Sequence, residues 1–381
     1  METRGLMKLL LECARPRSDA ASIRQAVAAV ADWDATVAQS MRHGIAPLVY
    51  WRVSQACPET LPPDVVKRLL TCFHRNAGHS LKLTGELLKL VSLFERAGIQ
   101  VVPFKGPAIA WSLYDSPALR EMSDLDLLIR PADARRAVEL LVDSGCRPAY
   151  GTDLRFFRSG RELPLTSSAG VALDLHWALA PSWFCHALDL DRFWSRLVTV
   201  SIAGHPIRTL APEDLLVFLC VHGAKHFWSS LHWLCDLAHL IDRTPLDWDS
   251  LMTYSRARCI SRTVSAGLLL AADVLGAAVP PAILAGARAC PHTSRIASCA
   301  QLWLHGRPVP RDFRSLEFQF QLSLVERPSD KLRFCWGVIE PCPADLESLT
   351  LPRPLFPVYY AFRPLRLVAK YSSLAARRLF S

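Results

Sequence analysis

The sequence lacks the cysteine patterns that would place it in a specialised class. Its twelve cysteines include no Cys-x-x-Cys pair, which argues against a zinc ribbon or a thioredoxin-like redox site. At 381 residues the chain is also too long for its cysteines to indicate a small disulfide-stapled scaffold. Because 51% of the residues are apolar, a packed core is available, and we expect reduced, mostly buried thiols.

Long uncharged apolar runs are missing too, although the mean hydropathy is high at +0.17. No window of about 18 residues is free of charge and proline in the way that a membrane span requires. The best candidate, Val264 to Val279, is shorter and contains Asp273. The N-terminal segment has no small-residue cleavage site, so no signal peptide is expected. We therefore expect a cytoplasmic protein without a transmembrane segment.

Acidic residues are absent beyond Glu347, in a chain whose net charge is +9. The cations that follow are Arg353, Arg363, Arg366, Lys370, Arg377 and Arg378. Such a basic end could meet phosphate groups on a nucleotide, a nucleic acid or a lipid surface, the last as a weak membrane-surface contact, and the alternative is a solvated helix face docked on the body. No motif that reads RNA or DNA accompanies the charge, so no specific nucleic-acid partner is expected.

The hydrophobic periodicity changes along the chain and divides it into four expected regions. Residues 1–98 and 212–305 show helical spacing, whereas residues 99–211 alternate between strand-like and helical runs. Residues 306–381 are proline-rich and basic. This order predicts an α+β fold, in which a small mixed-sheet core is flanked by N- and C-terminal helical regions.

Start and stop signals predict the individual elements. Helices are expected from a cap at Ser18 or Asp19 to residue 30, and over 33–53, 64–97, 106–114, 131–144, 213–229, 231–242, 248–259 and 262–276. Strands are expected over 99–104, 124–129, 155–157 and 171–176, with a pair of short strands on either side of a turn at 204–206. The matching starts at Trp33 and Trp248 indicate two similar helix starts, not a repeat.

Three acids stand in strand-like runs, where aspartate is normally depleted. Asp124 and Asp126 are two residues apart, so their side chains share one strand face about 6.6 Å apart along the backbone. Asp174 lies in a similar run. Three acids on neighbouring strands can form a divalent-metal cage of the kind used in phosphoryl and nucleotidyl transfer, with Asp174 also helping to deprotonate the acceptor. The alternative is that Asp124 and Asp126 are solvent-facing residues at a strand end.

Candidate phosphate ligands precede these acids. Lys105 and Gly106 form a turn before a helix N-terminus, where a lysine charge and free N–H groups can bind phosphate oxygens. Arg120 could grip phosphate with two hydrogen bonds. Alternatively, Lys105 is a surface lysine at a helix start, and Arg120 pairs with Glu121 or Asp124 and is structural.

The sequence resembles the uncharacterised bacterial nucleotidyltransferase family, a branch of the polymerase-beta-type nucleotidyltransferase superfamily, over roughly residues 30 to 280. The segments that carry the resemblance are Trp33-Asp34, Phe104-Lys105-Gly106, Tyr114, Leu119-Arg120, Met122 to Leu128, Leu173 to Trp177, Pro212-Glu213-Asp214, His222 to His226 and Trp233 to Leu237. The wider superfamily has a Gly-Ser pair where this chain has Lys105-Gly106.

The resemblance implies an enzyme that moves a nucleoside monophosphate from an NTP to a hydroxyl or similar acceptor and releases pyrophosphate. Asp124, Asp126 and Asp174 would hold two Mg²⁺ ions, or Mn²⁺, while Ser123 would join Lys105, Gly106 and Arg120 at the nucleotide. The acceptor would be a small molecule, sugar or peptide. The alternative is a non-catalytic nucleotide-binding or scaffold protein that keeps the fold.

His222 and His226 are four residues apart on an expected helix and could face one metal ion. No glutamate follows His222, and no third ligand is clearly placed. Two other interpretations stay open at this point. The histidines could be buried and hydrogen-bonded within the helical region, or their helix face, with Lys225, could close over the nucleotide or the acceptor.

Overall fold

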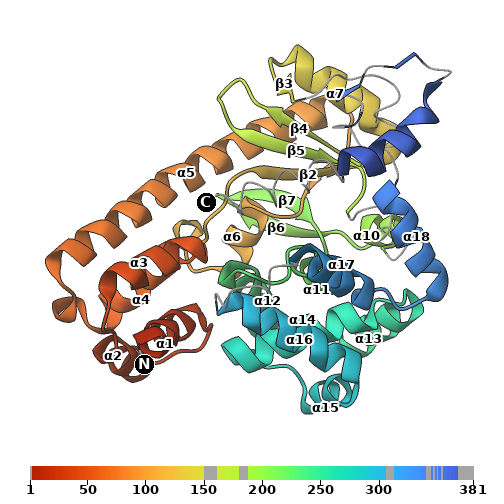
Figure 1. The fold of residues 1–381 in the computed structure, drawn as a ribbon. Helices are drawn as coiled ribbons and strands as arrows, with labels where there is room; N and C mark the ends of the chain where they lie inside the picture. Colours follow the sequence, from red (N-terminus) through yellow and green to blue (C-terminus); the bar gives the residue numbers. More distant parts are fainter. Residues whose placement is uncertain are drawn as a thin grey trace.

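The computed structural model describes residues 2–149, 161–179, 188–305, 313–339, 345, 348–349, 351–352 and 355–367. Figure 1 shows a sheet at the top, a group of N-terminal helices at the lower left and a group of C-terminal helices at the lower right. The fold is α+β, as the alternation of the sequence predicts. The strand expected over 155–157 lies outside the described residues.

Four short helices form the N-terminal group, and aspartates begin two of them. The helices are α1 (Glu2–Ala14), α2 (Ala20–Ala28), α3 (Trp33–Arg42) and α4 (Ala46–Ala56). Asp19 caps α2 by accepting from the Ser22 N–H, and Asp32 caps α3 by accepting from the Ala35 N–H. The single helix expected over 33–53 is wrong, because Gly44 takes a positive φ of 65° and separates α3 from α4.

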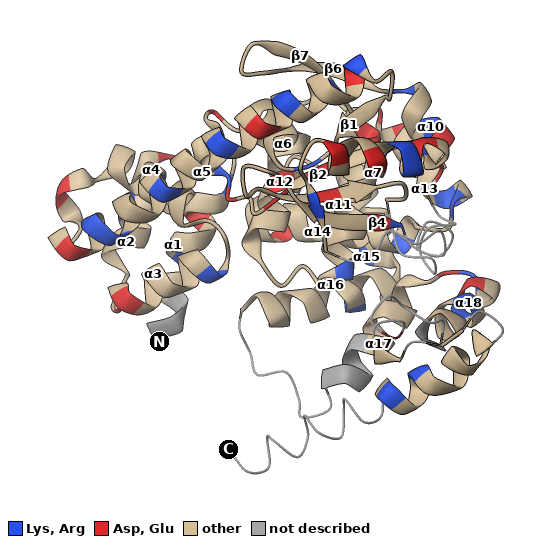
Figure 2. Cartoon of the chain, turned by 90° about the horizontal axis from the view of Figure 1, so that it is seen from above, with Lys and Arg blue, Asp and Glu red and all other residues tan. Residues whose placement is uncertain are grey.

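The long helix α5 (Pro63–Arg96) connects the N-terminal group to the sheet (Figure 1). It follows the 3-10 turn η1 (Pro58–Thr60) and ends before Gly98, whose φ is 65°. Figure 2 shows Lys and Arg interspersed with Asp and Glu along it, which is typical of a solvent-facing helix surface. Its C-terminal half, from Leu83 to Phe94, packs against one face of the sheet.

The main sheet has five strands in the order β1-β2-β5-β4-β3. They are β1 (Val101–Pro103), β2 (Leu125–Ile129), β3 (Arg147–Pro148), β4 (Glu162–Thr166) and β5 (Ala172–His176). Between them lie α6 (Pro107–Leu113), η2 (Pro117–Leu119), η3 (Pro131–Asp133) and α7 (Ala134–Asp143). Strands β2 and β5 are parallel, and the other neighbours are antiparallel.

The two faces of the sheet have different roles. Leu125, Leu127, Leu173 and Leu175 point to the face that packs on α5 and α7 in one hydrophobic cluster. Strand side chains alternate, so Asp126 and the polar residues of β5 point to the opposite face. A second sheet of β6 (Val198–Ile202) and β7 (His205–Thr209) adjoins β1, and Thr209 donates to the Pro103 carbonyl.

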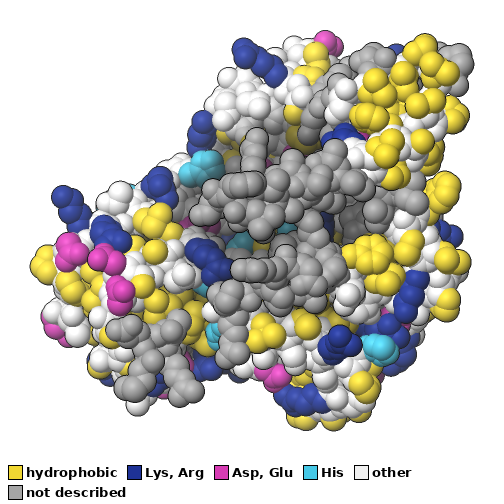
Figure 3. Space-filling model, viewed as in Figure 1, with side chains coloured by type: hydrophobic (Ala, Val, Ile, Leu, Met, Phe, Trp, Pro, Cys, Tyr) yellow, Lys and Arg dark blue, Asp and Glu magenta, His cyan; other side chains and the backbone are white. Residues whose placement is uncertain are grey.

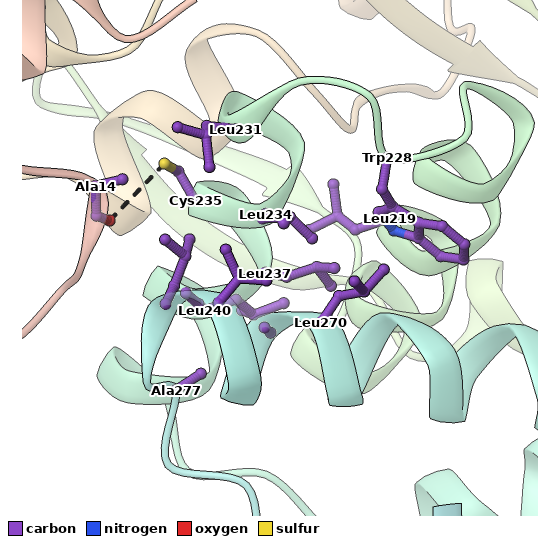
Figure 4. Close-up of a cluster of buried hydrophobic side chains, with 14 of the residues drawn as sticks. Ala14, Leu219, Trp228, Leu231, Leu234, Cys235, Leu237, Leu240, Leu270 and Ala277 are labelled. Atoms are coloured by element: carbon purple, nitrogen blue, oxygen red, sulfur yellow. Dashed lines mark hydrogen bonds between the residues drawn. The ribbon is translucent and has the colours of Figure 1, made fainter. Parts of the chain in front are cut away.

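Helices after the second sheet form the C-terminal group. They include α11 (Pro212–Lys225), α12 (Leu231–Arg243), α13 (Trp248–Ala257) and α14 (Ser261–Leu275). The short helix α10 (Leu190–Ser195) precedes the second sheet. In Figure 4, leucines of α11, α12 and α14 meet in a buried cluster, and the Cys235 thiol donates to the Ala14 carbonyl of α1. This contact joins the first and third expected regions in one core. The division into four regions stays a prediction.

The last described helices are α15 (Pro281–Ala289), α16 (Pro291–Leu304), α17 (Phe313–Leu324) and α18 (Pro328–Ile339). Figure 3 shows apolar side chains on the right of the molecule. Helix α18 exposes Leu332 and Trp336. None of the helices in the described part of the chain has both the length and the apolar character that crossing a membrane requires. The ten cysteines described are all free thiols, five of them buried.

Candidate functional site

Two carboxylates lie side by side at the centre of the polar sheet face. The parallel pairing of β2 and β5 places Asp126 directly opposite Asp174. Neighbouring strands are only about 4.8 Å apart, so the two side chains emerge next to each other. Asp126 is buried, whereas Asp174 is half-buried. The register, which the sequence does not reveal, therefore brings together two of the three predicted acids.

His176 connects this pair to a further acid. It lies two residues after Asp174, on the same strand face, and its Nε2 is 3.1 Å from Asp126 Oδ1. Its Nδ1 is 3.1 Å from Glu162 Oε2, because Glu162 on β4 is the direct cross-strand partner of His176. Burial lowers the pKa of His176, but hydrogen bonds to the two carboxylates outweigh this effect and raise it. When the ring is protonated, it can donate to Asp126 and to Glu162 at the same time.

Asp126 is held in its charged form by two cationic groups. Burial alone would raise its pKa, but Lys105 and His176 hold it well below its usual range. Lys105 Nζ is 2.6 Å from Asp126 Oδ1, the same oxygen that His176 contacts. Glu162 behaves similarly, since its hydrogen bond to His176 lowers its pKa to about 2.

Asp174 is electrostatically the opposite case. In the described part of the chain, its carboxylate has no hydrogen bond or ion pair. Burial raises its pKa to about 6, and the charges of Asp126, Asp124 and Glu162 add to this increase against the opposing effect of His176. An acid that is crowded by other acids without a bonded counter-charge is stabilised by any cation that binds beside it.

These residues fit a divalent cation. Ligand atoms of Asp126, Asp174 and His176 all lie within 4.8 Å of one another. Carboxylate oxygens suit Mg²⁺ and Mn²⁺, and the unpaired Asp174 supplies charge that the protein leaves uncompensated. Asp124 is not in this group. The strand begins one residue later than expected, at Leu125, and the Asp124 carboxylate accepts a hydrogen bond from Ser123.

The turn before α6 brings the predicted phosphate ligands beside the acids. Gly106 has φ 54° and ψ −125°, which favour glycine, and an added Cβ would lie 3.2 Å from the Asp124 carbonyl oxygen. Lys105 stands over the rings of Phe104 and Phe218, at 5.6 and 5.8 Å from their centroids. Helix α6 has only seven residues. The lysine charge is therefore the stronger anion-binding feature of this turn.

Arg120 is engaged elsewhere. Its Nε and Nη2 donate to the two carboxylate oxygens of Asp236, each at 2.8 Å, and the Tyr114 hydroxyl donates to the same acid at 2.8 Å. Arg120 and Asp236 are both buried. In this arrangement the guanidinium is not directed at a phosphate. The acid that pairs with Arg120 is Asp236, and not Glu121 or Asp124 as the structural alternative expected.

Helix α11 is connected to the acids through a series of aromatic contacts. Phe218 contacts Phe104, and Phe104 contacts His176, both as edge-to-face rings. His222 and His226 pack against each other at 4.8 Å, and His226 stacks on Trp233 at 5.0 Å. Burial lowers the pKa of His226 to about 4, with Lys225 adding to the effect. In the described residues, neither histidine joins a group of metal ligands.

A pocket of ≈ 440 Å³ lies on the Ser123 side of the acids. Arg75 and His79 of α5 line it together with Glu121, Ser123 and His232. The Ser123 hydroxyl donates to Asp124, so this residue connects the pocket to Asp124, whereas Asp126 and Asp174 do not line the pocket. Its volume is within the range of about 300–1,000 Å³ that is typical of small-molecule sites.

Glu162, His176 and Asp236 belong to the site or to its neighbouring network but were not predicted as such from the sequence. His176 carried a signal, because its spacing from Asp174 places both on one strand face. Glu162 carried no comparable signal, and Asp236 was marked only by the Trp233 to Leu237 segment that carries the family resemblance. Glu162 depends on the β4–β5 register, and Asp236 is 116 residues from its partner Arg120.

Comparison with known proteins gives one family. The family described as uncharacterised nucleotidyltransferase matches residues 29–276. This range contains both sheets, the three acids and the helices from α3 to α14. No curated protein matches the chain.

Proposed function

Because the chain belongs to the uncharacterised nucleotidyltransferase family, we propose that it moves a nucleoside monophosphate from an NTP to an acceptor hydroxyl or similar group. The acceptor oxygen attacks the α-phosphorus, the bond to the β-phosphate oxygen breaks, and pyrophosphate leaves. The observation that carries the proposal is the side-by-side pair of Asp126 and Asp174.

Asp126, Asp174 and the nearby Asp124 would hold the divalent cations, Mg²⁺ or Mn²⁺, two per site. Bound there, they would neutralise the triphosphate and activate the attacking hydroxyl. His176 would orient Asp126 through its hydrogen bond and would itself be held by Glu162. Asp174 would also help to accept the proton of the acceptor hydroxyl.

The nucleotide would lie between this sheet face and α11. Lys105 would contribute its charge to the phosphates, with Gly106 allowing close approach of the backbone and Ser123 at the edge. Lys225, exposed near the end of α11, would face the same region, since its charge helps to lower the pKa of Glu162. Arg120 would act indirectly by fixing the segment before the acids. The pocket beside Ser123 offers space for a small, polar acceptor such as a sugar or a peptide end.

Radioactive NTPs test the proposal. The purified protein is incubated with Mg²⁺ or Mn²⁺ and pools of sugars, peptides and small molecules, with label in either the α- or the γ-phosphate. Label from the α-position should appear on an acceptor, and label from the γ-position should appear in pyrophosphate. Asp174→Asn should abolish transfer, whereas Asp34→Asn, which removes an exposed acid on α3, should not.

Transfer of γ-label to an acceptor would indicate a kinase and contradict the proposal. Binding of NTP and metal without pyrophosphate release from any pool would instead favour the non-catalytic nucleotide-binding alternative. Calorimetry on the same preparations separates these outcomes, because it reports binding independently of turnover.

A further inference from the structure

We propose that Lys105 is an internal counter-cation that a divalent metal displaces: its ammonium holds Asp126 until the metal binds and then pairs with the triphosphate. This inference rests on the proposed function and specifies the exchange of charges at its site. It makes Lys105 a positioning residue that couples metal binding to nucleotide binding.

The ion pair itself is the first step of the argument. Lys105 Nζ and His176 Nε2 both contact Asp126 Oδ1, at 2.6 and 3.1 Å. The side chains of Asp126 and Lys105 are only 3% and 16% exposed, so water screens this contact weakly. A metal ion on Asp126 would lie close to the ammonium, and two cations beside one carboxylate repel each other strongly at such a site.

The surroundings of Lys105 allow it to move. Its ammonium lies over Phe104 and Phe218, whose ring faces attract a cation without fixing its direction. Within the described residues, Asp126 is the one acid in ion-pair contact with Lys105. When a metal ion takes that acid, the ammonium needs a new anion, and the phosphates of a nucleotide bound at this turn would supply one.

Asp174, which has no bonded partner in the described part of the chain, favours replacement of the Lys105 ammonium by a divalent cation. The site gathers the carboxylates of Asp126, Asp174 and Glu162. Lys105 contacts Asp126, and His176 contacts Asp126 and Glu162, but neither of them forms an ion pair with Asp174. A divalent cation near both Asp126 and Asp174 compensates one more carboxylate than the ammonium does. Metal and nucleotide should therefore bind cooperatively, because each relieves the unpaired charge left by the other.

Lys105→Met tests this coupling, because the two ligands should respond in opposite directions. Binding of Mn²⁺ alone, followed by the electron paramagnetic resonance of the free ion, should tighten about tenfold or more, since a neighbouring opposite charge shifts a carboxylate by about 1–3 pKa units. Binding of α,β-methylene-ATP with Mn²⁺, followed by calorimetry, should weaken. Lys105→Arg, which keeps the charge, should stay near the wild type in the Mn²⁺ measurement.

Lys225→Met is the matched control for Mn²⁺, because it removes a nearby cation that forms no ion pair with Asp126. Its effect should stay below about threefold, as expected for a partly screened charge. Weaker Mn²⁺ binding in Lys105→Met, or equal tightening in both variants, would overturn the inference while leaving the proposed function intact. Absence of Mn²⁺ binding in every protein, with unchanged circular dichroism, would overturn both.

Discussion

Two acids in this protein, Asp236 and Asp174, are removed from water in different ways. Asp236 lies in the helical core with bonds to Arg120 and Tyr114. Burial would raise its pKa, but the Arg120 charge outweighs this effect and lowers it. Asp174 lies on the sheet face, where burial and other acids raise its pKa to about 6. The charge of Asp236 is satisfied by partners within the protein, whereas in the described part of the chain Asp174 has no hydrogen-bonded or ion-paired partner.

The difference teaches how to separate a structural acid from a functional one. Both acids lie in segments that carry the family resemblance, so the motif alone does not distinguish them. A bidentate partner and a lowered pKa indicate a carboxylate that holds the fold together. A crowded carboxylate without a bonded partner lowers the stability of the fold, which makes it a candidate for ligand binding.

Breaking the buried ion pair between Arg120 and Asp236 should have the largest effect on stability. Arg120→Met leaves Asp236 buried and unpaired, and should lower the free energy of unfolding by about 3–5 kcal/mol. Urea denaturation measures this loss. The lowered pKa of Asp236 means that the pair stabilises the protein above the ordinary carboxyl pKa of about 3.9, and that this contribution is lost as the pH falls below that value.

The double variant Arg120→Met with Asp236→Leu is the control, because it removes both charges. It should recover most of the lost stability. Removal of the exposed Arg68–Asp34 pair should cost only about 0–1 kcal/mol. An Arg120→Met loss no larger than that of the exposed pair would contradict the structural role.

Removing the central site acid should mainly affect metal binding. Asp126→Ala deletes the carboxylate that β2 places opposite Asp174, and Mn²⁺ affinity should fall about 100-fold or more. Electron paramagnetic resonance of free Mn²⁺ measures the change. Asp133→Ala, at an acid beyond the same strand, should bind Mn²⁺ like the wild type, and equal losses in both variants would argue against a site at Asp126.

Loosening the support of Asp126 should have a smaller effect. His176→Gln removes the bridge between Asp126 and Glu162, and Mn²⁺ affinity should fall about tenfold. Glu162→Gln should give a still smaller loss, because it acts only through His176. The same Mn²⁺ titration ranks the two variants. A larger loss for Glu162→Gln than for His176→Gln would contradict this order.

Removing the charge of Asp174 should stabilise the metal-free protein, because this acid is crowded by other acids. A raised pKa means that the folded state loses stability as the pH rises from about 4 to about 6. Asp174→Asn should therefore gain on the order of 1 kcal/mol at pH 7.5, after allowance for solvent screening, and this gain should disappear near pH 4. Thermal melts with a chelator measure it. Destabilisation at pH 7.5 would show that Asp174 is not crowded.

Much of the fold could be predicted from local signals. Asp19, Asp32 and Asp247 each begin a helix as its N-cap, and Gly98 follows the end of α5. These residues act through hydrogen bonds and dihedral angles within a few positions of themselves, so the sequence contains the relevant information. The break at Gly44 was missed, because the apolar spacing continues across it.

The candidate site was predictable only in part. Asp126 and Asp174 could be recognised in the sequence because a strand rarely contains an acid. The Lys105-Gly106 turn lies beside them, as expected. The partners of these residues were not predictable. Strand register decides which carboxylate Lys105 contacts and which acid of β4 His176 contacts. A register shift of one residue would turn these side chains to the other face of the sheet.

The sequence by itself determined the class of the fold, the family and the strands that carry the acids, because these follow from short-range periodicity and from matched motifs. Only the tertiary structure decided which charges are paired. It joined Arg120 to Asp236 across 116 residues and left Asp174 without a partner in the described part of the chain. Whether a charge is paired depends on contacts between segments far apart in the sequence, and those contacts arise only when the sheet and the helices pack together.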